Sequence, residues 1–279
     1  MIGIATDSTC DLPETVIREL GIEVVPLYIN YGSHGFLDGV EISRQEFYER
    51  LPGSNPLPTT GTPGSKAFRK AYEKLSQAGA SEVLSIHISS SLSATVDVAR
   101  TAAAETHSIP VTVVDSGQLS LGTGFMVEAA ARAAQEGRKL QEIQNMLEEI
   151  GRRTHVFAAL DTLEFLRRSG RMNRVVAGIG SLLQIKPLLK MHQGTPTSER
   201  VRTSDKSIER LIELLSDLQP LERVALVHTH AADKARGLYQ RVQKLLPAGE
   251  VSSVDITPVI GTHIGPGAVG FACISAVRD

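Results

Sequence analysis

The chain has 279 residues, of which 42% are hydrophobic, 22% charged and 4% aromatic, and its formal net charge is −2. This composition is typical of a globular protein in water, and the small net charge excludes a bulk attraction to nucleic acid or to an anionic membrane. The chain has no Trp and few other aromatic residues, so a single-stranded nucleic-acid platform of stacked aromatic rings is also excluded.

The first half of the sequence alternates between short apolar runs and amphipathic runs, which is typical of a wound, mostly parallel α/β sheet. Helix signals precede the amphipathic runs, such as Asp11 and Pro13 before the first and Ser43 with Glu46, a capping box, before the second. Strands are predicted at residues 2–6, 22–30, 82–88 and 111–115, and helices at residues 11–20, 43–51, 64–79, 93–105 and 121–137.

The regular alternation of predicted strands and helices ends after a further helical run at residues 138–153. Strands are then predicted at residues 155–160, 222–230, 251–257 and 268–277, helices at residues 162–170 and 204–218, and a strand pair within residues 183–202 around Gly194 and Pro196. Hairpin-like connections of this kind favour an α+β arrangement. We therefore predict an N-terminal α/β domain at residues 1–153 and a C-terminal α+β domain at residues 154–279.

Two cysteines, Cys10 and Cys273, predict neither a disulfide framework nor a metal site, and we expect both to be buried as small apolar residues. The first ten residues lack the basic and long apolar regions of a signal peptide, and no apolar run approaches 18 residues. We therefore expect a cytoplasmic protein with no integral membrane segment.

Polar side chains follow three predicted strands of the first domain, in the runs at residues 6–11, 89–93 and 114–120. In an open α/β sheet the carboxyl ends of the strands meet at one edge, where ligands bind. Helix N-termini at that edge offer unpaired N–H groups, and hydroxyl donors beside them favour an anion such as a phosphate or a carboxylate. The same Ser and Asp residues can also serve only as helix caps, so the pattern alone leaves both interpretations open.

The sequence contains none of the common cofactor or metal motifs. No GxGxxG run follows the first strand, no GxxxxGK[ST] loop is present, and the eight histidines show no HExxH spacing. We therefore expect no cofactor, no metal and no independent use of ATP. The glycine-rich run at residues 261–270 precedes a strand rather than a helix, which predicts a fixed turn that presents His263.

A serine hydrolase acting on acyl esters is the enzymatic alternative. Ser93, His263 and Asp115 supply the three residue types of a nucleophile, a base and an acid. However, the sequence lacks the G-x-S-x-G elbow that usually presents such a serine. A carboxylate-binding set of Ser, Thr and His uses the same residue types without any nucleophile.

Several segments, in the same order and spread over almost the whole chain, resemble the DegV family of bacterial fatty-acid-binding proteins. They are IGIATDSTCDLP (2–13), FLDGVEISRQEFYERL (36–51), LPTTGTPG (57–64), ISSSLSATVDVA (88–99), VVDSGQLSLGTG (113–124), LEFLRRSGRMNRVVAGIGSLLQIKPLL (163–189) and GTHIGPGAVGFA (261–272). The chain departs from the family pattern at Gly61, Thr62, Ser91, Ala94 and Ser169.

The resemblance implies a two-domain fold that binds a long-chain fatty acid and is not itself catalytic. It further implies that the protein presents the acid to a separate fatty acid kinase subunit for phosphorylation. Carried over by position, Thr60 and Ser93 would hydrogen-bond the carboxylate, with His263 close by and Ser91 as a possible extra donor.

The same resemblance places the kinase-docking face at Arg171, in the segment SGR, with Arg202 as a second candidate. A short basic cluster made of Arg167, Arg168, Arg171 and Arg174 is compatible with docking of an acidic surface. From composition alone, the cluster can equally be the solvated face of a helix.

Overall fold

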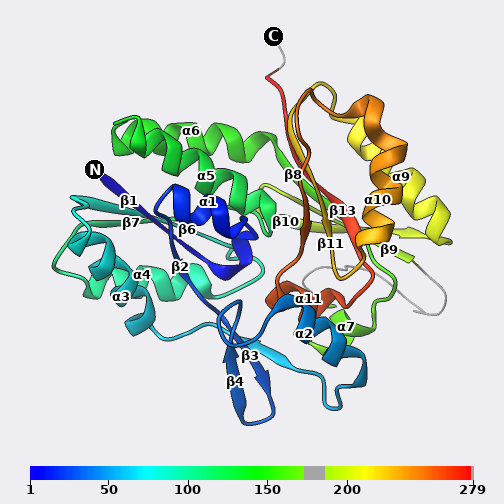
Figure 1. Ribbon diagram of the computed structural model, residues 1–279, viewed down its shortest axis with the longest axis horizontal. Helices are drawn as coiled ribbons and strands as arrows, with labels where there is room; N and C mark the ends of the chain where they lie inside the picture. Colours follow the sequence, from blue (N-terminus) through cyan, green and yellow to red (C-terminus); the bar gives the residue numbers. More distant parts are fainter. Residues whose placement is uncertain (173–185, 278–279) are drawn as a thin grey trace.

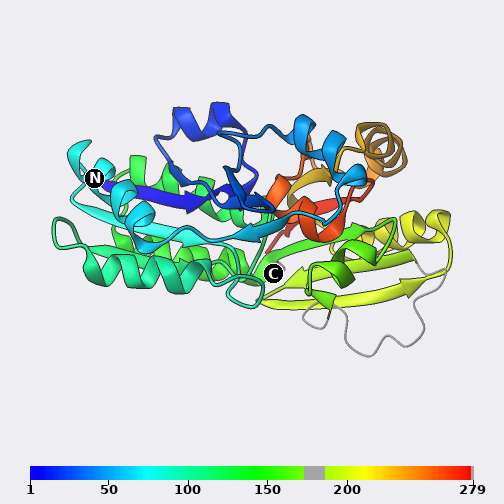
Figure 2. The same ribbon diagram turned by 90° about the horizontal axis from the view of Figure 1, so that it is seen from below.

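The structure is a computed structural model that describes residues 1–172 and 186–277, and this part of the chain contains three β-sheets (Figure 1). The two larger sheets form two lobes that lie side by side along the long axis of the molecule (Figure 2). The strands of the first large sheet all precede residue 153, and those of the second all follow it.

The first lobe is built on a parallel four-stranded sheet with the order β2-β1-β6-β7. Its strands are β1 (Ile2–Asp7), β2 (Glu23–Val25), β6 (Glu82–His87) and β7 (Val111–Asp115). Helices cover both faces, namely α1 (Glu14–Glu19), α5 (Leu121–Gln135) and α6 (Leu140–Arg153) on one side and α3 (Ser65–Gln77) and α4 (Thr95–Glu105) on the other. Successive strand residues therefore enter two different cores, as Ile4 and Ala5 do, and the strands read as continuous apolar runs.

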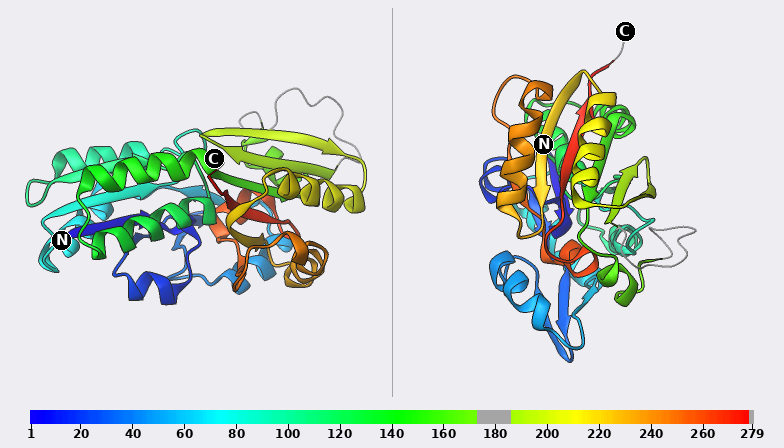
Figure 3. Two further views of the ribbon diagram at one scale, coloured as in Figure 1. Left: turned by 90° about the horizontal axis from the view of Figure 1, so that it is seen from above. Right: turned by 90° about the vertical axis from the view of Figure 1, so that its right-hand side faces the viewer.

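The second lobe is built on a six-stranded sheet with the order β10-β9-β8-β13-β11-β12, in which only β11 and β12 are parallel. Its strands are β8 (Thr154–Ala159), β9 (Lys186–His192), β10 (Thr195–Val201), β11 (Leu221–His228), β12 (Ser253–Asp255) and β13 (Val269–Ser275). Helices α9 (Ser204–Asp217) and α10 (Ala232–Val242) cover one face of this sheet (Figure 3). The other face packs against α5 and α6 of the first lobe and shares its main core.

A third, smaller unit lies beneath the boundary between the lobes (Figure 1). It consists of the antiparallel sheet β4-β3-β5, with β3 (Tyr28–Tyr31), β4 (His34–Leu37) and β5 (Thr59–Gly61), and of α2 (Arg44–Arg50). The core of this unit also takes in α11 (Pro258–Ile264), and the short helix α7 (Glu164–Arg168) packs beside it. Three 3₁₀ turns complete the described elements: Ser8–Cys10, Leu51–Gly53 and Gln243–Leu245.

The predicted fold class is confirmed, but the boundaries of some elements were wrong. The strand predicted at residues 22–30 is two strands in different sheets, β2 and β3, and they are separated by Pro26, which has no N–H to donate to a sheet. The first helix begins at Glu14 rather than at residue 11, because a 3₁₀ turn ends at Asp11 in the left-handed conformation. The small sheet and helices α10 and α11 were not predicted.

The contact between β13 and β8 gives a stability prediction. A Cβ atom on Gly270 would lie 1.8 Å from the carbonyl oxygen of Phe157 on the neighbouring strand. Gly270→Ala is therefore expected to reduce the free energy of unfolding by about 2–3 kcal/mol through overpacking. The measurement is urea denaturation followed by circular dichroism.

Gly237→Ala in α10 is the matched control, because a Cβ atom there meets no atom within 4 Å. The gain in helix propensity should raise the free energy of unfolding by up to about 1 kcal/mol. Equal stability of the two variants would contradict this description of the β13–β8 contact.

Candidate functional site

The carboxyl ends of β1, β6 and β7 point toward the second lobe, so their connecting loops lie at the boundary between the lobes (Figure 1). The loop from β6 to α4 contains four serines and turns back on itself through hydrogen bonds from the N–H groups of Leu92 and Ser93 to the carbonyl of Ser89. The N–H of Ser89 bonds to the carbonyl of Gln118 in the next loop. These bonds fix the serine loop against the loop that leads into α5.

A cavity of about 240 Å³ lies between the lobes. Most of its lining is aliphatic and comes from both lobes. The apolar lining residues are Leu27, Ile88, Leu92, Ala94, Leu119, Val156, Ala158, Leu160, Leu166, Leu189, Met191, Pro196, Val227, Ile256, Val259, Ile260 and Ile264. The polar and charged lining residues are Thr9, Thr60, Thr62, Ser93, Ser120, Arg171, Lys190 and His263. The predicted site residues Thr60, Ser93 and His263 therefore lie on one cavity.

Two sets of hydrogen bonds join segments that line this cavity. Thr60 Oγ1 in β5 hydrogen-bonds to Nε2 of His263 in α11 at 2.9 Å. Two residues later, Thr62 Oγ1 bonds to Thr95 Oγ1 at 3.2 Å, and Thr95 Oγ1 bonds to Ser93 Oγ at 2.8 Å. The start of α4, strand β5 and the end of α11 thus bring their polar side chains to one place.

His263 is held in its neutral form. Burial lowers the pKa of its ring to about 4, and the positive charge of Arg171 acts in the same direction. The second ring nitrogen, Nδ1, is buried and has no hydrogen-bond partner among the residues that the structure describes. A buried polar atom without a partner costs free energy, so a ligand that bonds to it would gain affinity.

The arginines predicted for docking differ in their positions. Arg171 follows α7 and lines the cavity, and its guanidinium donates to the carbonyl of Ser169 at 3.3 Å. Arg202 is exposed in the loop between β10 and α9 and does not line the cavity. Of the basic cluster, Arg167 and Arg168 both contact the Glu164 carboxylate, and Arg174 lies outside the described residues.

Ser91 is not among the lining residues of the cavity, and its hydroxyl bonds to Ser89 Oγ at 2.9 Å.

Asp115, the proposed acid of a hydrolase, accepts hydrogen bonds from Ser90 and from the N–H of Gly117. His263 instead directs Nε2 to Thr60 and has no acid at Nδ1 within the described chain. This geometry gives no support to a Ser93–His263–Asp115 triad.

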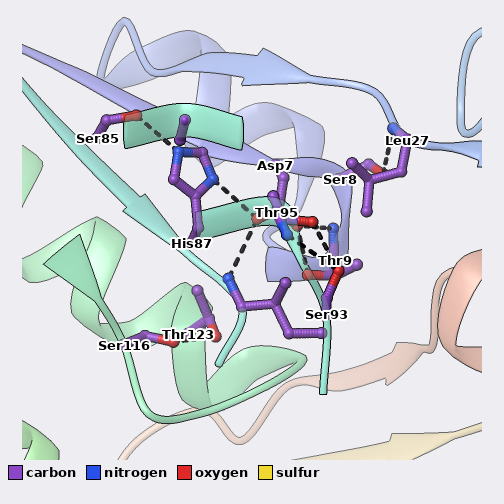
Figure 4. A network of polar contacts seen from close by, with 12 residues as sticks. Asp7, Ser8, Thr9, Leu27, Ser85, His87, Ser93, Thr95, Ser116 and Thr123 are labelled. Atoms are coloured by element: carbon purple, nitrogen blue, oxygen red, sulfur yellow. Dashed lines mark hydrogen bonds and ion pairs between the residues drawn. The ribbon is translucent and has the colours of Figure 1, made fainter. Parts of the chain in front are cut away.

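A different Ser–His–Asp chain, not predicted from the sequence, lies beneath the serine loop (Figure 4). Asp7 Oδ2 bonds to His87 Nδ1 at 2.9 Å, and His87 Nε2 bonds to Ser85 Oγ at 2.7 Å. All three side chains are fully buried, so no substrate can reach them. Burial alone would raise the pKa of Asp7, but His87 and Thr9 hold it below its usual value. The ionised carboxylate therefore ties the end of β1 to the N–H groups of Thr9 and Ile88.

The glycine-rich run was predicted as a turn that presents His263, and this was wrong. His263 lies in the last turn of α11, which begins with Pro258 at its first position, and the turn follows the helix. Two glycines of this run instead leave room for the side chains that pack against them. A Cβ atom on Gly261 would lie 2.3 Å from the Tyr48 hydroxyl, and one on Gly265 would lie 2.2 Å from the ring of Phe165.

No helix in the described part of the chain is long and apolar enough to cross a membrane. Among residues 1–172 and 186–277, no group of three or more His, Cys, Asp or Glu residues has the geometry of a metal site.

The lowered pKa of His263 predicts an acid-dependent loss of stability. As the pH falls from 6.5 to 4, the unfolded chain takes up a proton at this position and the folded chain does not, so the folded state loses stability. The loss is at most about 3 kcal/mol, and solvent reaching the partly exposed ring reduces it. His263→Gln should remove this part of the pH dependence in urea titrations at pH 7 and pH 4.5. An unchanged pH dependence would show that the ring titrates normally.

Comparison with known proteins is consistent with this architecture. Residues 1–276 match the model of a family described as uncharacterised protein, DegV family COG1307. The chain is 35% identical to a DegV domain-containing protein of Streptomyces coelicolor over 98% of both chains, and 32% identical to protein DegV of Bacillus subtilis over 97% of this chain and 98% of that protein.

Two solved structures are similar to the whole fold. One, described as showing fatty acid binding of a DegV family protein from Thermus thermophilus, superposes with a TM-score of 0.89 at 34% identity and covers 99% of both chains. The other, described as DegV, a fatty acid binding protein from Bacillus subtilis, has a TM-score of 0.89 at 31% identity over 98% of this chain and 99% of that one. The chain belongs to the DegV family.

Proposed function

We propose that the protein binds a long-chain fatty acid in the cavity between its lobes, with the carboxylate among Thr60, Ser93 and His263. The observation that carries this proposal is the composition of the cavity wall, which is mostly apolar and includes several hydroxyl groups, one neutral imidazole and few charged groups. A fatty acid has the matching distribution of one polar end and a long apolar remainder.

The energetics favour such a ligand. Each buried CH₂ group contributes about 0.8 kcal/mol, so a long chain gains on the order of ten kcal/mol before the costs of ordering it. Hydrogen bonds from hydroxyl and imidazole donors to an ionised carboxylate are stronger than neutral ones. The orphaned Nδ1 of His263 adds a group to which an acid can hydrogen-bond.

The related structures support the same ligand class. The neighbours from Thermus thermophilus and Bacillus subtilis are both described as fatty-acid-binding proteins, and each covers nearly all of this chain. Because the aliphatic wall is formed by both lobes, the similarity over the full length bears on the cavity itself and not only on one domain.

We further propose that the protein is a non-catalytic carrier in the cytoplasm, which presents the carboxylate to a separate fatty acid kinase subunit. The sequence lacks a phosphate-binding loop, so the phosphoryl donor must be bound by the partner. Arg171 is suited to this docking because it lines the cavity close to His263. Arg202, which is exposed, is the second candidate for the docking face.

The first test is lipid content and binding. Mass spectrometry of an organic extract of the purified protein should show a long-chain fatty acid, and delipidated protein should bind oleate or palmitate. Thr60→Ala and Ser93→Ala should each weaken binding by about tenfold, which corresponds to the loss of one charge-assisted hydrogen bond. Calorimetric titration measures both effects.

Ser90→Ala is the matched control, because Ser90 lies in the same loop but bonds to Asp115 and does not line the cavity. Its affinity for oleate should equal that of the unmodified protein. A protein that carries no lipid and takes up neither acid would refute the proposed ligand. Normal binding by both site variants would refute the proposed position of the carboxylate.

The second test separates docking from binding. Arg171→Ala should retain oleate in the cavity but lower the rate at which a fatty acid kinase catalytic subunit phosphorylates it, by about tenfold or more for the loss of a central interfacial arginine. Arg167→Ala, which removes an exposed arginine paired with Glu164, is the control and should leave the rate unchanged. Equal rates for Arg171→Ala and the unmodified protein would exclude the docking role.

A further inference from the structure

Asp11 is a buried carboxylate at the boundary between the lobes, with 1% of its surface exposed. Its Oδ1 accepts hydrogen bonds from the N–H of Thr257 at 2.8 Å and from Arg44 at 3.1 Å. Its Oδ2 accepts from Ser120 Oγ at 2.6 Å. One side chain thus contacts the start of α11, the start of α2 and the residue that precedes α5.

Two of these contacts link Asp11 to segments that line the cavity. Thr257 is the residue that precedes α11, and that helix carries His263 six residues later. Ser120 precedes α5 and itself lines the cavity. The carbonyl of Ile256, adjacent to Thr257, accepts from the Tyr48 hydroxyl at 2.9 Å, so the backbone before α11 is held at two successive positions.

The backbone at both ends of the Asp11–Ser120 hydrogen bond is strained. Asp11 has φ 54° and Ser120 has φ 51°, in the region that side chains other than glycine rarely adopt. Ser120 also has ψ −143°, a combination that is essentially restricted to glycine. Strained residues persist where surrounding contacts hold them, and they are concentrated at functional sites.

The surroundings of Asp11 raise the free energy of its ionised form. Burial raises its pKa to about 6, against the opposing effects of Arg44, Ser120 and Thr257. Asp38, which accepts from the Thr257 hydroxyl, adds a second buried carboxylate that raises the pKa of Asp11 further. Because this pKa lies above its usual value, burying the ionised form reduces stability at neutral pH, and the penalty shrinks as the pH falls below 6 and is gone below about 3.8. Ionisation of Asp11 therefore does not by itself stabilise the fold at neutral pH.

We propose that Asp11 is a positioning residue, which holds the start of α11 against the first lobe and thereby fixes His263 opposite the serine loop. This inference rests on the proposed function for its ligand, but the placement of His263 can be measured without any ligand. Asp11 itself does not line the cavity, so its effect on binding must pass through the groups that it holds.

The informative substitution is Asp11→Gly, because glycine adopts φ 54° without strain and the change removes only the side chain. The variant should keep a thermal unfolding midpoint close to that of the unmodified protein and should bind oleate about tenfold more weakly. Asp11→Asn should restore the affinity to within about threefold, because an amide retains an oxygen for Thr257 and tolerates positive φ. In a His263→Gln background, Asp11→Gly should cause no further loss.

Glu128→Gln is the matched control for a buried carboxylate. Glu128 lies on α5 away from the cavity and is paired with Arg132 and Arg223. This variant should lose stability and keep its affinity for oleate, the opposite of Asp11→Gly.

The ligand-free measurement is the nitrogen and carbon NMR spectrum of the His263 ring, assigned with His263→Gln. Asp11→Gly should shift these signals and Glu128→Gln should not. If the unmodified protein fails to bind oleate, the proposed function is wrong, and the ring signals still decide the role of Asp11. Unchanged ring signals in Asp11→Gly, or full binding by that variant, would overturn the inference.

Discussion

Helix α5 packs against both large sheets, and this shared packing sets the distance between the two lobes. This shared packing is possible because α5 carries small residues at positions that contact the two lobes. A Cβ atom on Gly122 would lie 2.7 Å from a methyl group of Val156 in the second lobe, and one on Gly124 would lie 2.4 Å from the Cys10 carbonyl in the first. Larger residues would push the sheets apart, so the width of the cavity between them depends on this helix.

This packing places the carboxyl ends of the strands at the boundary between the lobes, and their position determines which polar groups reach the site. Hydroxyl groups from the serine loop and from β5 meet a histidine from the far end of the sequence, and burial keeps that histidine neutral. A neutral imidazole and alcohols can donate hydrogen bonds to a carboxylate, and an aliphatic wall is compatible with an acyl chain. The same geometry gives no support to a hydrolase triad, because Ser93 is bonded to Thr95 and no acid orients His263 within the described residues.

The sequence was informative where the structure depends on local pattern and uninformative where it depends on contacts between distant segments. Alternating apolar and amphipathic runs predicted the parallel sheet, and the polar strand ends predicted Ser93 as part of a site. The break at Pro26, the helix that carries His263 and the buried chain of Asp7, His87 and Ser85 were missed. The break at Pro26 is a local signal that was overlooked, whereas the other two depend on partners far away in the sequence: the Tyr48 hydroxyl that fits against Gly261, for example, is separated from it by 213 positions. The hydrogen bond of Thr62 was likewise not predicted, because its partner Thr95 lies on another element.

The central claim is that the acid end of a fatty acid lies beside Thr60, Ser93 and His263, with its chain inside the cavity. A crystal structure of the protein with 2-bromopalmitate tests this most directly, because the anomalous signal of bromine marks the carbon next to the carboxylate. The account predicts one bromine peak next to the His263 ring and continuous chain density between the lobes. A bromine peak at the opposite end of the cavity, or a ligand bound outside it, would contradict the account.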